Sequence, residues 1–211
     1  MKVIVAAHPR RRPAVNRIVK HLGRQTAVAW DPDPEGAPSA IRTYRAALEL
    51  AGADAALILQ DDAVPHGEIG LFADAALRTN GYALVALYVG DKHGGGPQIT
   101  RAARRGERYA PMPLGHFVPT VALAWPAGAA AEFAAWIDRA DLRPEQYQDD
   151  EAVKLWRLAH GRDAIRAVCS IPSVCRHDND LPSLLNHGAH GHRDALMPWD
   201  TFARADWRER W

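Results

Sequence analysis

The sequence predicts an α/β domain with a mostly parallel central sheet, helices on its flanks and an irregular C-terminal tail. Two observations carry this prediction. Short apolar runs alternate with segments of helical periodicity through residue 89, and the runs lack the alternation of polar residues that half-exposed strands show. Strands that alternate with helices pair in parallel through right-handed crossovers. We expect one domain over residues 1–211, because this length suits one domain and no linker or repeat interrupts it.

The first half of the chain supplies the clearest elements. Each predicted strand is a short apolar run, and these runs are residues 3–7, 26–30, 55–59 and 82–89. The helices between them are marked by their ends: Pro13 and Gly23 bound the first, Ser39 and Gly52 the second, and Asn80-Gly81 closes the third. This order of elements supports the parallel sheet.

The pattern changes after residue 89. Residues 91–113 are polar and rich in Gly, Pro and Arg, which predicts a long loop, and we expect its arginines to lie on a lid that closes over a ligand. A strand is predicted at 116–125, a helix from Pro126, a helix from Asp149 or Asp150, and a strand at 165–170. Residues 172–211 have weak periodicity.

Bulk composition narrows the class of protein. Hydrophobic residues make up 47% and charged residues 24%, which is ordinary globular composition. The formal net charge is +1, so no overall field attracts nucleic acid or a membrane surface. The two cysteines are too few for a disulfide framework. No apolar stretch reaches the length of a signal peptide core or a membrane span. We therefore expect a cytoplasmic protein.

The strongest chemical signal is the acidic pair Asp61-Asp62, which directly follows the third predicted strand and Gln60. Ligands bind at the carboxyl ends of parallel strands, so position alone nominates this pair. Adjacent carboxylates repel each other, and a divalent cation with oxygen ligands removes the conflict. The alternative is that one carboxylate caps the next helix and the other is solvated.

Residues 59–65, Leu-Gln-Asp-Asp-Ala-Val-Pro, resemble the acidic motif of GT-A-fold glycosyltransferases. The similarity is to the Leu-Glu-Asp-Asp form of the lipopolysaccharide-type family 25 enzymes, to family 2 enzymes, and to small bacterial and phage relatives. The resemblance implies that Asp62 binds Mn²⁺ or Mg²⁺ and that Asp61 approaches the donor. Gln60 departs from the fully acidic motif, and a metal role at that position is not implied.

The same resemblance nominates further donor-binding residues. His8 and Arg10 follow the first strand, where the nucleotide pocket of the fold begins. Asp31, at the end of the second strand, resembles the acid that reads the uracil or ribose, and Arg45 resembles a residue near the donor. The alternatives are a solvated basic turn for His8 and Arg10, a turn residue for Asp31, and a solvated helix face for Arg45.

Two more roles come from the second half. Inverting GT-A enzymes place a general base where Asp149 and Asp150 stand, so Asp150 or Asp149 is the implied catalytic residue. Acids are also favoured in the first turn of any helix, which is the alternative. The segment around His177 resembles one that supplies another metal ligand, with His187 as second choice. A zinc site is a weaker alternative, because Cys169, Cys175 and the late histidines match no common zinc spacing.

The sequence thus predicts a metal-dependent, inverting glycosyltransferase. It would move a sugar from a nucleotide-diphosphate sugar, a UDP-sugar by resemblance, to a hydroxyl of a saccharide, a protein or a hydroxylated DNA base. The implied division is a nucleotide-sugar-binding half (1–89), an acceptor half (90–170) and a His- and Trp-rich tail (171–211). The alternatives are a metal-dependent phosphate-ester hydrolase and a non-catalytic nucleotide-sugar-binding module. The chain lacks a P-loop and a Gly-x-Ser-x-Gly elbow.

Overall fold

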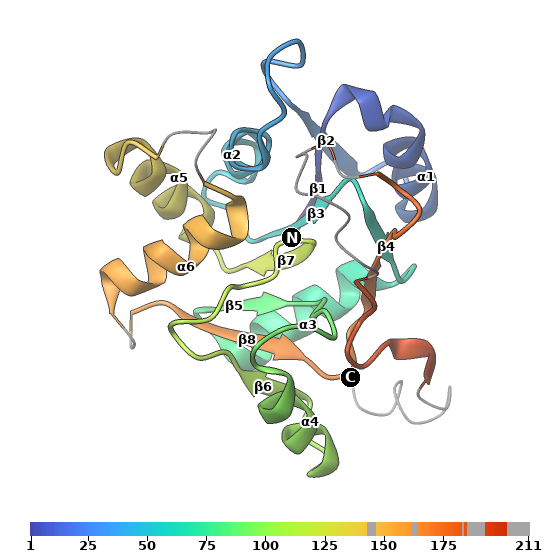
Figure 1. The fold of residues 1–211 in the computed structure, drawn as a ribbon, viewed down its shortest axis with the longest axis vertical. Coiled ribbons are helices and arrows are strands. Elements are labelled where there is room, and N and C mark those ends of the chain that lie inside the picture. Colours follow the sequence, from blue (N-terminus) through green and yellow to red (C-terminus); the bar gives the residue numbers. More distant parts are fainter. Residues whose placement is uncertain (143–146, 162–163, 183, 185–192, 202–211) are drawn as a thin grey trace.

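A computed structural model describes residues 1–142, 147–161, 164–182, 184 and 193–201 (Figure 1). A seven-stranded sheet with the strand order β2-β1-β3-β7-β5-β8-β6 lies at its centre. In that order the strands are Thr26–Trp30, Lys2–Ala7, Ala56–Gln60, Ala122–Trp125, Ala83–Ala86, Arg166–Ser170 and Tyr109–Pro111. A separate two-stranded sheet pairs β4 (Ala63–Pro65) with β9 (Cys175–His177). The predicted α/β class is confirmed.

The central sheet is mixed. Strand β1 is parallel to β2 and β3, and β5 is parallel to β8, as the alternation of strands and helices predicts. Strand β7 lies between β3 and β5 and is antiparallel to both, and β6 is antiparallel to β8 at one edge. Five strands therefore share one direction, and β7 and β6 oppose them.

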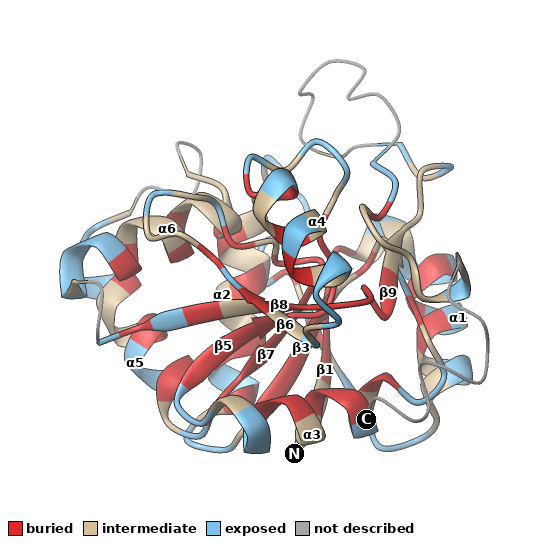
Figure 2. Cartoon of the chain, turned by 90° about the horizontal axis from the view of Figure 1, so that it is seen from below, coloured by how far each residue is buried: buried red, intermediate tan, exposed pale blue. Residues whose placement is uncertain are grey.

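Helices cover both faces of the sheet. They are α1 (Arg12–Leu22), α2 (Ala40–Ala51), α3 (Ile69–Asn80), α4 (Gly96–Arg104), α5 (Ala129–Arg139) and α6 (Asp149–His160). Apolar residues of α2, α4, α5 and α6 pack in one core layer, and those of α1 and α3 pack in the other. Figure 2 shows the strands buried between these layers. No helix among the described residues has both the length and the apolar character needed to cross a bilayer.

The core explains why the sheet strands contain so few polar residues. Trp125 of β7 stacks on Phe133 of α5, with ring centroids 5.3 Å apart, and Trp156 of α6 lies 5.0 Å from the same Phe133 ring. All three side chains are fully buried. This aromatic cluster fixes α5 and α6 against β7 and so places the first turn of α6 at the sheet edge.

The prediction of a long loop at 91–113 is wrong. The segment contains α4 and the short strand β6. Ile99 and Ala102 form the buried face of α4, and Pro97 lies in its first turn, where proline is tolerated. Arg101 and Arg104 therefore lie on a helix. The prediction that they belong to a closing lid has no support from this placement.

Candidate functional site

A cavity of about 940 Å³ opens at the carboxyl ends of β1 and β3. Because these two strands are parallel neighbours, the segments that follow them meet at one edge of the sheet. The walls also include the first turns of α2 and α6, the segments after β5 and before β7, and the end of β9. The polar residues that line the cavity include His8, Arg11, Gln60, Asp61, Asp62, Asp91, Lys92, His93, Thr120, Asp149, Asp150, His177 and Arg193.

Arg11 neutralises the acidic pair. Its Nη1 donates to Asp61 Oδ1 at 2.7 Å and to Asp62 Oδ2 at 2.8 Å. The backbone N–H of His8 donates to Asp61 Oδ2 at 2.8 Å, which fixes this carboxylate against the end of β1. Burial raises the pKa of Asp61, although the charge of Arg11 opposes that rise. The repulsion expected between the two carboxylates is thus balanced by a side chain of the protein itself.

The arginine that reaches the cavity is Arg11 and not Arg10. Residues Pro9–Arg11 form a single turn of 3₁₀-helix after His8, whose Nδ1 accepts a hydrogen bond from the N–H of Arg10. The Arg10 side chain is exposed and does not line the cavity. The sequence analysis nominated Arg10 rather than Arg11, because the tight turn that orients these neighbouring side chains has no distinctive residue pattern.

His177 lies beside Asp62, as the resemblance implies. The register of the small sheet pairs His177 with Ala63, the residue after Asp62. His177 Nε2 is 3.4 Å from Asp62 Oδ2, and the N–H of Asp178 donates to the Asp62 carbonyl at 2.7 Å. Burial alone would raise the pKa of Asp62, but His177 and Arg11 outweigh burial and lower it to about 2. Asp62 is therefore ionised at neutral pH.

These residues fit a divalent cation with an open coordination sphere. Asp62 Oδ1 is buried and has no hydrogen-bond partner among the described residues. His177 Nδ1 contacts Asn179 Oδ1 at 3.2 Å, so Nδ1 would keep its proton if a cation replaced the proton that Nε2 directs at Asp62. The described part of the chain contains no cluster of three or more His, Cys, Asp or Glu side chains arranged for a metal. Mg²⁺ takes one or two protein carboxylates and keeps its other positions for water and phosphate, so Asp62 and His177 are the residues that would hold it.

Asp149 and Asp150 begin α6, which forms another wall of the cavity. Asp149 is only 4% exposed, and its Oδ2 accepts a 2.5 Å hydrogen bond from Gln60 Nε2 while its Oδ1 accepts one from the N–H of Asp150. Burial, and next the repulsion of Asp150, raise the pKa of Asp149 to about 7, although hydrogen bonds from Thr120 and Gln60 oppose the rise. Gln60 thus joins the acidic motif on β3 to the first turn of α6.

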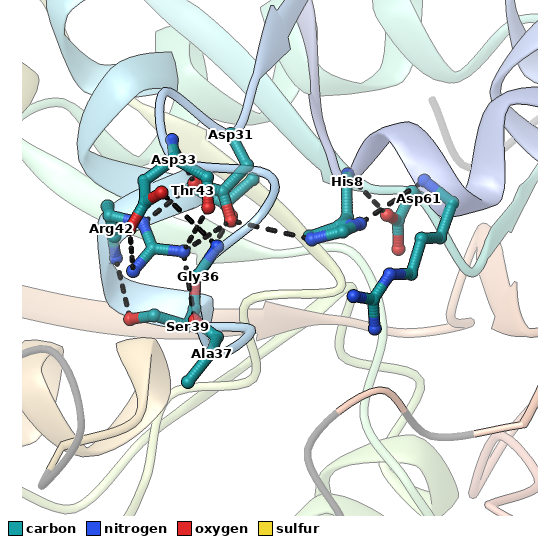
Figure 3. A network of polar contacts seen from close by, with 10 residues as sticks. His8, Asp31, Asp33, Gly36, Ala37, Ser39, Arg42, Thr43 and Asp61 are labelled. Atoms are coloured by element: carbon teal, nitrogen blue, oxygen red, sulfur yellow. Dashed lines mark hydrogen bonds and ion pairs between the residues drawn. The ribbon is translucent and has the colours of Figure 1, made fainter.

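Asp31 and Arg45 are not brought to the cavity. Arg42 Nε and Nη2 hold the two oxygens of Asp31 at 2.7 and 2.9 Å, and the Asp31 side chain is fully buried (Figure 3). His8 Nε2 lies 3.9 Å from the same carboxylate. Arg45 pairs with Asp138 of α5 and with Glu49. Asp31 therefore anchors the loop between β2 and α2, and Arg45 joins two helices.

No protein-family model matches this sequence, and a search of curated proteins finds no match either. The geometry of the cavity is therefore what bears on function. Its walls carry an ionised Asp62 beside His177, an arginine, and a pair of acids at a helix start.

The late histidines cannot be placed in this site, because His187, His190 and His192 lie outside the described residues. Cys169 and Cys175 are buried free cysteines, and burial raises the pKa of both thiols, that of Cys169 to about 12. Cysteine binds zinc as the thiolate. These two thiols therefore give no support to the zinc alternative.

Proposed function

We propose that this chain is a metal-dependent glycosyltransferase of the GT-A type. It transfers the sugar of a nucleotide-diphosphate sugar, a UDP-sugar by resemblance, to a hydroxyl group of an acceptor. The observation that carries the proposal is one cavity with two different acidic walls. Asp62, with an unpartnered buried oxygen and His177 at 3.4 Å, lies on one wall, and the Asp149-Asp150 pair lies on the other.

The first wall binds the donor diphosphate. Asp62 and His177 would hold Mn²⁺ or Mg²⁺, which would supply positive charge to offset the charge that grows on the leaving diphosphate. Asp61 is held by the His8 N–H and by Arg11, so its position is fixed before the donor arrives.

The second wall activates the acceptor. Both oxygens of Asp149 accept hydrogen bonds and its side chain is almost fully buried, so we assign the general base to Asp150, the next residue along the helix. Asp150 removes the proton of the acceptor hydroxyl as the acceptor oxygen bonds to the anomeric carbon. The bond from that carbon to the diphosphate breaks at the same time. Direct displacement of this kind inverts the anomeric configuration.

The test is a screen of nucleotide-sugars with Mn²⁺ that measures released nucleoside diphosphate, with saccharide, protein and hydroxylated DNA acceptors. We expect release that depends on Mn²⁺, that is accelerated by an acceptor, and that is lost in Asp150→Asn. Turnover of simple phosphate esters without any use of nucleotide-sugars would instead identify a hydrolase. Nucleotide-sugar binding without turnover for any acceptor would indicate a binding module.

A further inference from the structure

Two buried polar atoms on the donor wall have no partner. Arg11 Nε and Asp62 Oδ1 are each inaccessible to solvent, and neither has a hydrogen-bond partner among the described residues. The Arg11 side chain is only 10% exposed, so nine-tenths of it is buried. Unpaired buried donors and acceptors are costly, and in native sites they often await a ligand. A ligand that satisfies both atoms offers a donor group or a cation to the carboxylate and an acceptor oxygen to the guanidinium, and a nucleoside diphosphate with its divalent cation offers both.

Arg11 also contacts the other oxygen of Asp62, which is the one that faces His177. Arg11 Nη1 contacts Asp62 Oδ2 at 2.8 Å, and His177 Nε2 approaches the same oxygen to 3.4 Å. A divalent ion held by Asp62 and His177 would be within a few ångströms of the guanidinium, and the two positive charges would repel each other. The other contact of Nη1, with Asp61 Oδ1 at 2.7 Å, does not involve the cation's ligands.

We propose that Arg11 takes the place of the divalent cation in the donor-free protein. When the cation arrives, Arg11 releases Asp62 to the cation, and Arg11 itself binds the donor diphosphate. This inference rests on the proposed function. Asp61 keeps its bond to the guanidinium and so holds Arg11 near the diphosphate, while Asp62 passes to the cation. The released guanidinium offers its donors to a phosphate oxygen, a geometry for which arginine is well suited. The two acids of the motif therefore have different partners.

The test measures metal and nucleotide binding separately. Arg11→Ala is compared with Arg10→Ala, which removes the same charge from an exposed neighbour outside the cavity. Calorimetry gives the affinity for Mn²⁺ alone and the affinity for UDP at saturating Mn²⁺. We expect Arg11→Ala to bind Mn²⁺ about tenfold more tightly than the wild type and UDP about tenfold more weakly, since a charge-assisted hydrogen bond is removed in each case. Arg10→Ala should match the wild type in both.

Opposite changes in the two affinities separate this role from a purely structural one, because a damaged site would bind both ligands less well. Thermal unfolding shows whether Arg11→Ala folds. If Arg11→Ala does not fold, Arg11→Gln, which keeps more of the side-chain volume, is used in its place. Mn²⁺ affinity that falls or stays unchanged without Arg11 overturns the inference, as does Mn²⁺ binding to no variant. If Mn²⁺ binds more tightly without Arg11 but no form binds UDP or another nucleotide, competition at Asp62 stands and the proposed function fails.

Discussion

Asp149→Asn should make the protein more stable at neutral and alkaline pH. Burial and the neighbouring Asp150 raise the pKa of the Asp149 carboxyl to about 7 from its ordinary 3.8. The folded protein therefore holds a proton that the unfolded chain releases. The stability that this group contributes is complete below pH 3.8 and is lost as the pH rises through the folded value, near 7. Asparagine is neutral at every pH, so the loss should not occur in the variant.

The size of the effect follows from the pH range between the pKa of Asp149 in the unfolded chain and its pKa in the folded protein. Stability falls by about 1.4 kcal/mol for each pH unit over which only the unfolded chain is ionised. Between pH 5 and pH 7 the wild type should therefore lose up to roughly 3 kcal/mol from this group. The pKa of Asp150 is also raised, by its own burial, and this residue remains in the variant, so some slope persists. Gln60 can reverse its side-chain amide to meet the new asparagine amide.

Urea denaturation at pH 5 and pH 8 measures the effect. Asp138→Asn is the matched control: Arg45 lowers the pKa of Asp138, so its contribution is lost only in acid, below this range. The wild type and the control should both lose stability from pH 5 to pH 8, and Asp149→Asn should lose clearly less. An identical slope in all three proteins would show that Asp149 is ionised in the folded state, and the description of its burial would be wrong.

Three further outcomes are expected. Asp150→Asn should lower turnover about 10²- to 10⁴-fold in transfer kinetics while UDP binding by calorimetry is unchanged, and a product of retained anomeric configuration would refute the base assignment. Arg42→Ala should destabilise the protein by about 3–5 kcal/mol in urea, because it leaves the buried Asp31 carboxylate unpaired. Arg45→Ala removes a more exposed ion pair and should change stability by less than about 1 kcal/mol. Equal losses of stability in Arg42→Ala and Arg45→Ala would contradict this difference. His177→Ala should weaken Mn²⁺ binding in a titration and recover activity in excess Mn²⁺, whereas an unchanged affinity would exclude this ligand.

Much of the fold could be predicted because its signals are local. Strands β1, β2 and β3 and the helices between them follow from apolar runs, helix periodicity and turn residues. The direction of β7 could not be predicted, since a strand buried on both faces has the same composition whichever way it runs. Helix α4 was missed because its glycines and arginines suggested a loop, while only Ile99 and Ala102 marked its buried face.

The site residues also divide into those that the sequence predicts and those that only the fold brings together. The positions of Asp61 and Asp62 followed from the end of a strand, and His177 followed from a resemblance. The contacts that complete the site join distant segments: Gln60 with Asp149, and the three-residue strands β4 and β9 that bring His177 to Asp62. The Asp31 carboxylate was predicted at a strand end, but nothing local shows that Arg42 and not a ligand would bind it.

The proposed function requires Asp62 to hold the cation that binds the donor diphosphate. Calorimetry of UDP binding with Mn²⁺ and with EDTA, on the wild type and on Asp62→Ala, measures this dependence. We predict that the wild type binds UDP only weakly in EDTA and more tightly with Mn²⁺, and that Asp62→Ala shows no difference between the two conditions although it remains folded. Binding that Mn²⁺ strengthens equally in Asp62→Ala, or wild-type binding that is as tight in EDTA, would contradict the claim.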